Sequence, residues 1–239
     1  MDVNGKLALV TGGTDGIGRE LARILRARGA IVIVTGRTPE RISAMAAEGF
    51  EVIAADLSHA AGVDAVVGAL AGRPLALLVN NAGANVDHML DDTIDLAAAD
   101  AAIHLNLNAP IQLIVRLLPA LQAQPAATIV NVTSGLAIAP RAGGAVYCAT
   151  KAALRSYTQA IRYQLRGTNV HVIEALPPVV DTKMTAGRDG KKQSPVACAT
   201  EIADGIRSGK TQVNAGMVKL LTLVYSLSPA LARKVMIRF

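Results

Sequence analysis

The sequence predicts an α/β fold, a doubly wound, seven-stranded parallel sheet with helices on both faces, in a single domain. Short apolar runs of strand length alternate with segments of helical periodicity along most of the 239 residues, as βαβ units with right-handed crossovers do. The runs are nearly continuous in Val, Ile and Leu, as expected of strands buried on both faces. The hydrophobic content of 51% is ample for the core of one such domain.

The expected elements follow one another in a regular order. Strands are expected at residues 6–11, 30–35, 51–56, 74–80, 127–133, 169–175 and 211–215. A first helix is expected directly after the first strand, and further helices at residues 39–48, 60–71, 93–122, 145–166 and 199–209. Pro110 lies inside the longest helical tract and is expected to disturb it, because proline has no backbone N–H to donate.

Composition argues against several classes of protein. No uninterrupted apolar run reaches the length of a spanning helix, and the first residues lack the pattern of a secretory signal. The two cysteines, Cys148 and Cys198, are too few for a disulfide scaffold, so a cytoplasmic location is expected. The net charge of +6 favours anionic ligands. Zinc-ligand spacing and base-reading patterns are absent from the sequence, so neither a metal nor a nucleic acid partner is expected.

The first strand leads into a glycine-rich turn and a helix. Gly12, Gly16 and Gly18 stand in this turn, and apolar positions after it recur with helical spacing. A strand, a turn and a helix start in this order bring free backbone N–H groups and the positive end of the helix to one point, which suits a pyrophosphate. Three glycines alone could mark an ordinary turn, but the strand and helix stand where a dinucleotide site needs them.

The end of the second strand bears on which dinucleotide binds. An acidic residue there usually binds the ribose diol of NAD, whereas an arginine suits the 2′-phosphate of NADP. The sequence Val34-Thr35-Gly36-Arg37 has no acid and one arginine, so NADP(H) is expected in preference to NAD(H). Arg37 could also be a solvated loop residue, and the carboxylate of Asp15 would oppose a phosphate if it faced one.

A second group of residues brings a phenol and an amine together. Tyr147 and Lys151 are four residues apart, so they share one face of the expected helix. A phenol beside an ammonium group can perform acid–base chemistry. Ser134 stands at the carboxyl end of the fifth strand, where the ligands of parallel sheets gather, although a serine there is also common in ordinary turns.

Together these motifs resemble the short-chain dehydrogenase/reductase family. The resemblance covers about residues 4–182 and rests on the glycine turn, Asp56-Leu57, Asn80-Asn81-Ala82-Gly83, Ser134 and Tyr147-x3-Lys151. It implies a Rossmann fold and reversible hydride transfer between a nicotinamide and a ketone or secondary alcohol. The cofactor-binding residues expected in this chain are Gly12, Thr14, Asp15, Gly16, Ile17, Gly18, Arg37, Asp56, Leu57, Asn81, Ala82, Gly83, Tyr147, Lys151, Pro177, Val180 and Thr182.

The resemblance also implies the catalytic roles. Tyr147 is the general acid/base, and Ser134 holds the carbonyl oxygen. Lys151 favours the phenolate of Tyr147 and binds the nicotinamide ribose. Asn106, rather than its neighbour Asn108, supports a water that links to Lys151.

The segment after the sixth strand departs from the usual family pattern. Most relatives have Pro-Gly where this chain has Pro177-Pro178, and the second proline fixes φ and removes a donor. The combination of VTSGLA (132–137), YCATKAALRSYTQ (147–159) and PPVVDT (177–182) resembles a subgroup of oxidoreductases named after the D-alanyl-lipoteichoic acid operon. Residues 183–210 correspond to the family's substrate lid, although their basic part, 183–195, could equally be a solvated loop.

The tail, residues 216–239, is apolar and ends in basic residues. An amphipathic helix here could pack on the sheet, contact another subunit or lie on a membrane surface, and the first two interpretations are preferred. A homo-oligomer (dimer or tetramer) acting on a small carbonyl or alcohol compound is expected. Two other functions stay open, a nucleotide-binding regulatory or scaffold protein without turnover and an isomerase or dehydratase on the same fold.

Overall fold

The computed structural model describes residues 1–90 and 94–238. Seven strands form one sheet in the order β3-β2-β1-β4-β5-β6-β7, and each neighbouring pair is parallel. The strands are β1 (Leu7–Val10), β2 (Ile31–Gly36), β3 (Glu51–Ala54), β4 (Leu75–Asn80), β5 (Ala127–Val132), β6 (Val170–Leu176) and β7 (Gln212–Asn214). The predicted doubly wound, seven-stranded parallel sheet is confirmed.

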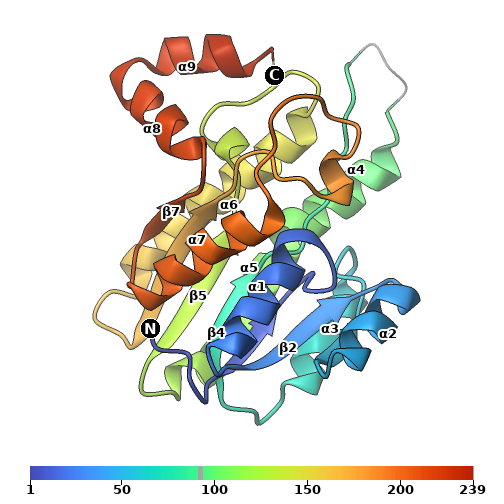
Figure 1. Cartoon of the computed structure of the whole chain (residues 1–239), viewed down its shortest axis with the longest axis vertical. Helices are drawn as coiled ribbons and strands as arrows, with labels where there is room; N and C mark the ends of the chain where they lie inside the picture. The colour runs from blue at the N-terminus through green and yellow to red at the C-terminus, as the bar shows by residue number, and fades with distance from the viewer. Residues whose placement is uncertain (91–93, 239) are drawn as a thin grey trace.

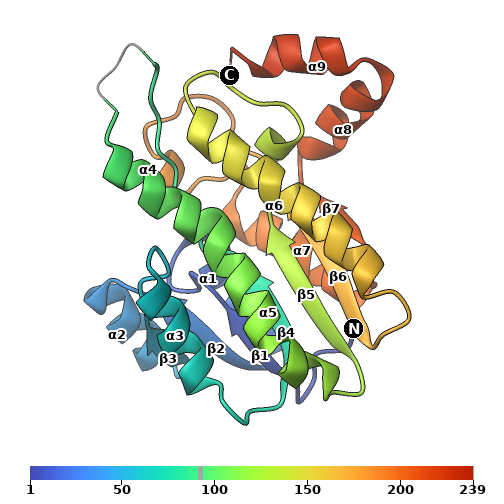
Figure 2. The same cartoon turned by 180° about the vertical axis from the view of Figure 1, so that it is seen from behind.

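Helices cover both faces of this sheet (Figures 1 and 2). The α-helices of the described residues are α1 (Gly16–Ala27), α2 (Pro39–Ala47), α3 (Ala60–Ala69), α4 (Leu96–Ile103), α5 (Ala109–Gln122), α6 (Ala145–Gln164), α7 (Pro195–Arg207), α8 (Val218–Leu227) and α9 (Pro229–Met236). Helices α1 and α7 lie on one face, and α3, α5 and α6 lie on the other. Crossovers to both sides of β1 open a crevice at the carboxyl ends of the strands.

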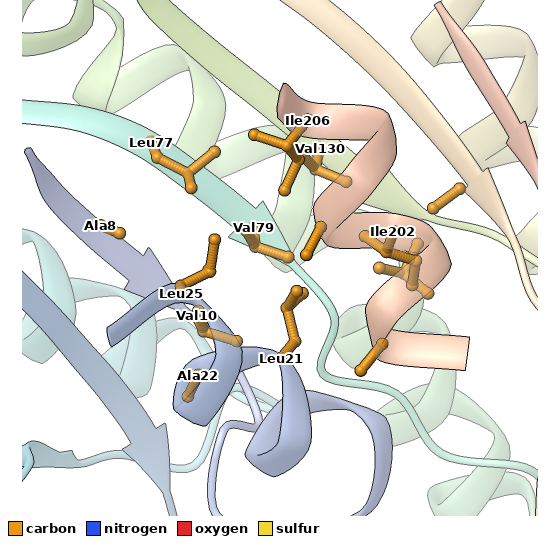
Figure 3. Packing of buried hydrophobic residues seen from close by; sticks show 14 of the residues in the cluster. Ala8, Val10, Leu21, Ala22, Leu25, Leu77, Val79, Val130, Ile202 and Ile206 are labelled. Atoms are coloured by element: carbon orange, nitrogen blue, oxygen red, sulfur yellow. The ribbon is translucent and has the colours of Figure 1, made fainter. Parts of the chain in front are cut away.

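Two apolar clusters sandwich the sheet because successive strand side chains point to opposite faces. Ala8 and Val10 of β1 belong to the cluster under α1 and α7, whereas Leu7 and Leu9 belong to the cluster under α3 and α5. Figure 3 shows the first cluster, in which Leu21 and its neighbours from α1 pack beside side chains of α7 on the same face of β1, β4 and β5. This packing fixes α1 over the sheet and thereby fixes the turn that precedes it.

The long helical tract contains an irregular turn before Pro110. Its expected start at residue 93 lies outside the described residues, and α4 begins at Leu96, after the N-cap residue Asp95. Between α4 and α5, residues His104–Asn108 form one π-helical turn. Because Pro110 has no N–H for the carbonyl of Asn106, the α-helical bond between them cannot form. The helix is therefore widened, not broken.

By length and composition, Leu96–Gln122 is the one helical tract among residues 1–90 and 94–238 that could span a membrane. In the structure, α5 packs against β4, β5 and α3, as a core helix does.

The other predicted elements are present with small shifts at their ends. The largest shift is in α7, which begins at Pro195 and not at 199. Its Ncap residue Ser194 accepts a hydrogen bond from the backbone N–H of Ala197 at 3.2 Å, and Pro195 suits the first helical position.

The tail forms two helices where one was expected. Ser228 separates α8 from α9, and its hydroxyl accepts a hydrogen bond from the backbone N–H of Leu231 at 3.3 Å. Figure 1 shows the pair beyond the carboxyl edge of the sheet, far from the N-terminus. The Ile237 carbonyl accepts a hydrogen bond from the Ala142 N–H at 3.1 Å, which ties the tail to the loop before α6. Several large apolar side chains of the tail are exposed: Met217, Leu220, Leu223, Leu227, Leu231, Val235 and Ile237.

Candidate active site

A cavity of about 420 Å³ opens where the carboxyl ends of the strands meet. It is lined by loops that follow β1, β2, β3, β4, β5 and β6 and by the start of α6. Most predicted site residues line it: Gly12, Thr14, Asp15, Gly16, Ile17, Arg37, Asp56, Leu57, Asn81, Ala82, Gly83, Ser134, Tyr147, Lys151, Pro177 and Thr182. Gly18, Asn106 and Val180 do not line it.

The glycine turn is held against the end of β4. Gly12 has φ +61°, and a Cβ there would lie 2.9 Å from the Cα of Ala82. A Cβ on Gly18 would lie 2.4 Å from both the Gly12 carbonyl and the Asn81 Nδ2. Asn81 Nδ2 donates to the Thr11 carbonyl at 2.9 Å. The side chain of Asn81 therefore joins the loop after β4 to the glycine turn, and the absence of a side chain at Gly18 leaves room for it. Gly12 lets the turn approach Ala82 closely at the wall of the cavity.

The charge of Asp15 is balanced within the structure. One carboxylate oxygen accepts a hydrogen bond from the Gly16 N–H at 2.9 Å, and the other lies 2.8 Å from Nη1 of Arg41. Arg41 also lines the cavity, and sequence reasoning did not select it. Its position four residues after Arg37, in the first turns of the helix after β2, was the signal that could have identified it.

Arg37 and Asp56 lie at the same end of the cavity. Nη1 of Arg37 is 3.4 Å from Oδ2 of Asp56, and both side chains are exposed. Burial alone would raise the pKa of Asp56, but hydrogen bonds from Ser58 and the charge of Arg37 outweigh it and lower the pKa. The end of β2 thus presents two guanidinium groups and no carboxylate of its own.

Tyr147 and Ser134 meet at the opposite end. Burial raises the pKa of the Tyr147 hydroxyl, while a hydrogen bond with Ser134 and the positive charges of Arg188 and Arg141 act to lower it. Ser134 also accepts a hydrogen bond from the backbone N–H of Leu136 at 3.1 Å, which orients its side chain. Sequence reasoning connected neither arginine with Tyr147, because each becomes a neighbour only through loop packing.

Lys151 is buried beside the phenol. Its Nζ donates to the carbonyl of Val132 at 2.8 Å and lies 5.8 Å from the centre of the Tyr147 ring. Burial lowers the pKa of Lys151 from its ordinary 10.5 to about 8. The expected shared face of Tyr147 and Lys151 is therefore present, with the ammonium held by a strand-end carbonyl.

Asn106 is buried in the π-helical turn and acts through a neighbouring loop. Its Oδ1 accepts from the Ala84 N–H at 2.9 Å, and its Nδ2 donates to the Ala84 carbonyl at 2.8 Å and to Thr150 Oγ1 at 3.1 Å. A Cβ on Gly83 would lie 3.1 Å from Asn106 Oδ1 and 3.5 Å from Lys151 Nζ. Gly83 thus leaves a small polar gap between the amide and the ammonium.

The segment after β6 reaches the cavity in part. Pro177 and Pro178 both line it, as do Lys183 and Met184, which sequence reasoning did not single out. The side chain of Val180 is buried in the apolar cluster under α7. Only the backbone of Val180 is left for the predicted cofactor contact.

Comparison with known proteins gives a consistent result. A family model described as short chain dehydrogenase matches residues 6–193. The uncharacterized oxidoreductase DltE of Bacillus subtilis (strain 168) is 38% identical over 224 residues, 89% of each chain. A short chain dehydrogenase from Burkholderia cenocepacia J2315, solved in complex with NADP, has a TM-score of 0.89 at 26% identity and covers 99% of each chain. A short chain dehydrogenase/reductase from Burkholderia phymatum in complex with NAD has a TM-score of 0.81 at 22% identity, covering 95% of this chain and 96% of that one.

Proposed function

Because this chain belongs to the short chain dehydrogenase family, as its motifs predicted, we propose that it is an NADP(H)-dependent oxidoreductase with Tyr147 as general acid/base. It transfers a hydride reversibly between the nicotinamide and a ketone or secondary alcohol. The observation that carries this proposal is that Ser134, Tyr147 and Lys151 line the same cavity as the glycine turn.

The residues present fit a nicotinamide dinucleotide. Gly12 leaves space where any side chain would meet Ala82, and Gly16 and Ile17 of the first turn of α1 line the cavity, where the N-terminus of a helix suits a phosphate. Arg37 would hold the 2′-phosphate that distinguishes NADP, and Arg41 offsets the carboxylate of Asp15. Similar structures hold either NADP or NAD, so they do not distinguish the two cofactors. The proposed preference for NADP(H) therefore rests on the arginines at the end of β2.

When bound, the nicotinamide supplies the hydride in reduction and accepts it in oxidation. The chain's own residues handle the proton. The raised pKa of Tyr147 keeps its phenol protonated at neutral pH, which is the form that donates a proton to a carbonyl oxygen. Ser134 donates a hydrogen bond to the same oxygen and stabilises its developing negative charge.

Lys151 and Asn106 support this proton transfer. The ammonium of Lys151 is held by the Val132 carbonyl and can donate its other protons to ribose hydroxyls. Asn106 fixes Ala84, and the polar gap beside Gly83 suits a water that links toward Lys151. Residues 183–210 act as the substrate lid in this proposal, since Lys183 and Met184 line the cavity.

The protein is further proposed to be a cytoplasmic homo-oligomer, a dimer or tetramer. Both cysteines are free and buried, which suits a reducing compartment. Exposed apolar side chains on α8 and α9 offer a subunit contact. Sedimentation equilibrium should show more than one chain per particle. Flotation with liposomes that depended on the tail would instead favour membrane contact.

The catalytic proposal is tested with Tyr147→Phe and a panel of ketones, aldehydes and acyl thioesters. NADPH consumption should fall by roughly 10²- to 10⁴-fold, while the dissociation constant of NADPH stays within a factor of about two. Full turnover by Tyr147→Phe would refute the mechanism. Cofactor binding without any turnover by the unaltered protein would favour a scaffold, and product without net cofactor change would favour an isomerase.

Cofactor preference is tested separately by titrating the nicotinamide fluorescence. NADPH should bind more tightly than NADH. The reverse order would refute the NADP assignment and leave the role of Tyr147 untouched.

A further inference from the structure

Three loops meet beside Tyr147 through charged side chains that the proposed reaction does not use. Asp87 follows β4, Arg141 lies between Ser134 and Tyr147, and Arg188 follows Thr182. Arg141 is paired with one oxygen of Asp87, and Nη2 of Arg188 lies 3.7 Å from the other. The loops of Asp87 and Arg141 are also joined through their backbones, since the N–H of His88 donates to the Gly143 carbonyl at 3.1 Å.

The charges in this cluster do not balance. Among the ion pairs of residues 1–90 and 94–238, these two guanidinium groups share the one carboxylate of Asp87, which leaves one positive charge in excess within that set. Burial and the neighbouring charge of Arg188 both lower the pKa of Arg141. An additional anion would relieve this repulsion.

Arg141 is also short of hydrogen-bond acceptors. Its side chain is only 11% exposed, and its Nε is buried without a hydrogen-bond partner among the described residues. A Cβ on Gly144 would lie 2.9 Å from this Nε, so a glycine there leaves room for the guanidinium group. A buried guanidinium N–H without an acceptor is costly, and a carboxylate is the acceptor that matches its geometry best.

The cluster lies near Tyr147, just outside the residues that line the cavity. Both arginines act electrostatically on the Tyr147 hydroxyl, and each of the three segments that carry the cluster also contributes a residue that lines the cavity: Asn85, Ser134 and Met184. The buried Oδ1 of Asn85 has no hydrogen-bond partner among residues 1–90 and 94–238. A substrate held by Tyr147 would therefore extend toward these polar groups.

We propose that Arg141 and Arg188 form an anion-binding subsite, and that the substrate is a keto acid or hydroxy acid whose carboxylate they bind. This inference rests on the proposed function, because it places the substrate with its carbonyl at Tyr147. Asp87 holds the two arginines together when the substrate is absent, and the substrate carboxylate balances the excess positive charge. The subsite thus selects acids over uncharged ketones of the same shape.

The first test compares 2-, 3- and 4-oxo acids with their methyl esters as substrates of the full-length protein in the presence of NADPH. For the best acid, kcat/KM should exceed that of its ester by 10-fold or more. Arg188→Gln should reduce this acid-to-ester ratio by roughly 10- to 100-fold, mainly through the KM of the acid. Lys191→Gln is the matched control, because it removes an exposed charge from the same segment and should preserve the ratio.

Arg141→Lys provides a second variant that keeps the charge. An ammonium cannot reproduce the fixed donors of a guanidinium group, so the acid-to-ester ratio should fall here too. Circular dichroism shows whether each variant folds. If either Arg141→Lys or Arg188→Gln fails to fold, the acid-to-ester ratio of the other variant tests the subsite. Equal kcat/KM for acids and esters in the unaltered protein, or a ratio unaffected by either substitution, would overturn the subsite.

A binding measurement separates this inference from the proposed function. Malonate is titrated calorimetrically into the protein saturated with NADP⁺, which blocks the anion site at the other end of the cavity. Binding should weaken at least 10-fold in Arg188→Gln and persist in Lys191→Gln. If no carbonyl compound were turned over and malonate binding still required Arg188, the function would fail and the subsite would stand. If esters were turned over and malonate did not bind, the proposed function would stand and the subsite would fail.

Discussion

Lys151 is a buried cation that donates to the strand-end carbonyl of Val132. The lowering of its pKa from 10.5 to about 8 corresponds to about 3 kcal/mol of unfavourable free energy in the folded protein when the amine is charged. The unfolded chain keeps its proton up to the ordinary pKa of 10.5. The cost is therefore complete below pH 8 and fades as the pH rises from 8 to 10.5.

Replacing this lysine should stabilise the protein while it abolishes turnover. In Lys151→Met the cost of the buried charge disappears, but the Val132 carbonyl loses its donor, which costs about 1–2 kcal/mol. We expect the melting temperature at pH 7 to rise by about 2–6 °C. The advantage should shrink between pH 8 and 10.5. Thermal denaturation followed by circular dichroism at pH 7 and 9.5 measures both, and a lower melting temperature at pH 7 would contradict the interpretation.

Arg37 and Arg41 should differ in their effect on the two cofactors. Arg37 pairs only weakly with an exposed carboxylate, so Arg37→Ala should weaken NADPH binding about 10-fold and leave NADH binding unchanged. Arg41 neutralises Asp15 beside the first turn of α1, so Arg41→Ala should weaken both cofactors. Fluorescence titration of the two variants with both nucleotides checks this. Equal losses for NADPH and NADH in Arg37→Ala would contradict the assignment.

Among the elements, the π-helical turn places the buried amide of Asn106 against the loop that follows β4. The turn widens the tract at Pro110 and holds Asn106 where both its polar groups reach Ala84. Residues 83–90 have little regular structure of their own, so these bonds supply part of their order. The same loop continues to Asp87 and its arginines.

Asn106→Ala should therefore destabilise the protein as well as slow it. Three hydrogen bonds to a fully buried side chain are lost, and Ala84 keeps two unpaired backbone groups. We expect the free energy of unfolding in urea to fall by about 2–4 kcal/mol. Asn108→Ala in the same turn is the control, because that side chain is exposed, and its effect should stay within about 0.5 kcal/mol. Equal losses in the two variants would refute the role of Asn106.

The sequence predicted local features more accurately than contacts between loops. Strand periodicity and the glycine turn gave the sheet and most of the cavity, because both depend on residues close together in the chain. The interaction of Arg188 with Tyr147, and the pairing of Arg41 with Asp15, depend on how the loops pack after folding. Gly18 and Val180 belong to motifs of the family, but neither lines the cavity. Gly18 is packed tightly against Asn81, and the side chain of Val180 is buried under α7.

At the scale of the whole molecule, the tail supports the loop of Arg141 from outside the cavity. Its last helix is tied to the loop of Arg141 by the hydrogen bond from Ala142 to Ile237, and no described residue of the tail lines the cavity.

Deleting residues 228–239 should therefore raise the KM of the carbonyl substrate about 10-fold, the equivalent of one lost hydrogen bond at a loop. The dissociation constant of NADPH should change by less than about twofold. Leu227→Gln, which alters an exposed side chain of the retained helix α8, is the control and should change neither value. Parallel losses of cofactor and substrate affinity in the deletion would show that the tail supports the whole fold and not one loop.

The cavity is lined by residues from Gly12 to Met184, so its wall exists only after nearly every βα unit has joined the sheet. A nucleotide bound there stabilises the folded chain and not the unfolded one. At a concentration one hundred times its dissociation constant, it adds about 2.7 kcal/mol to the free energy of unfolding. The population of globally unfolded chains open to a protease falls about 100-fold in consequence. The supply of cofactor would thus set the lifetime of each molecule as well as its rate of turnover.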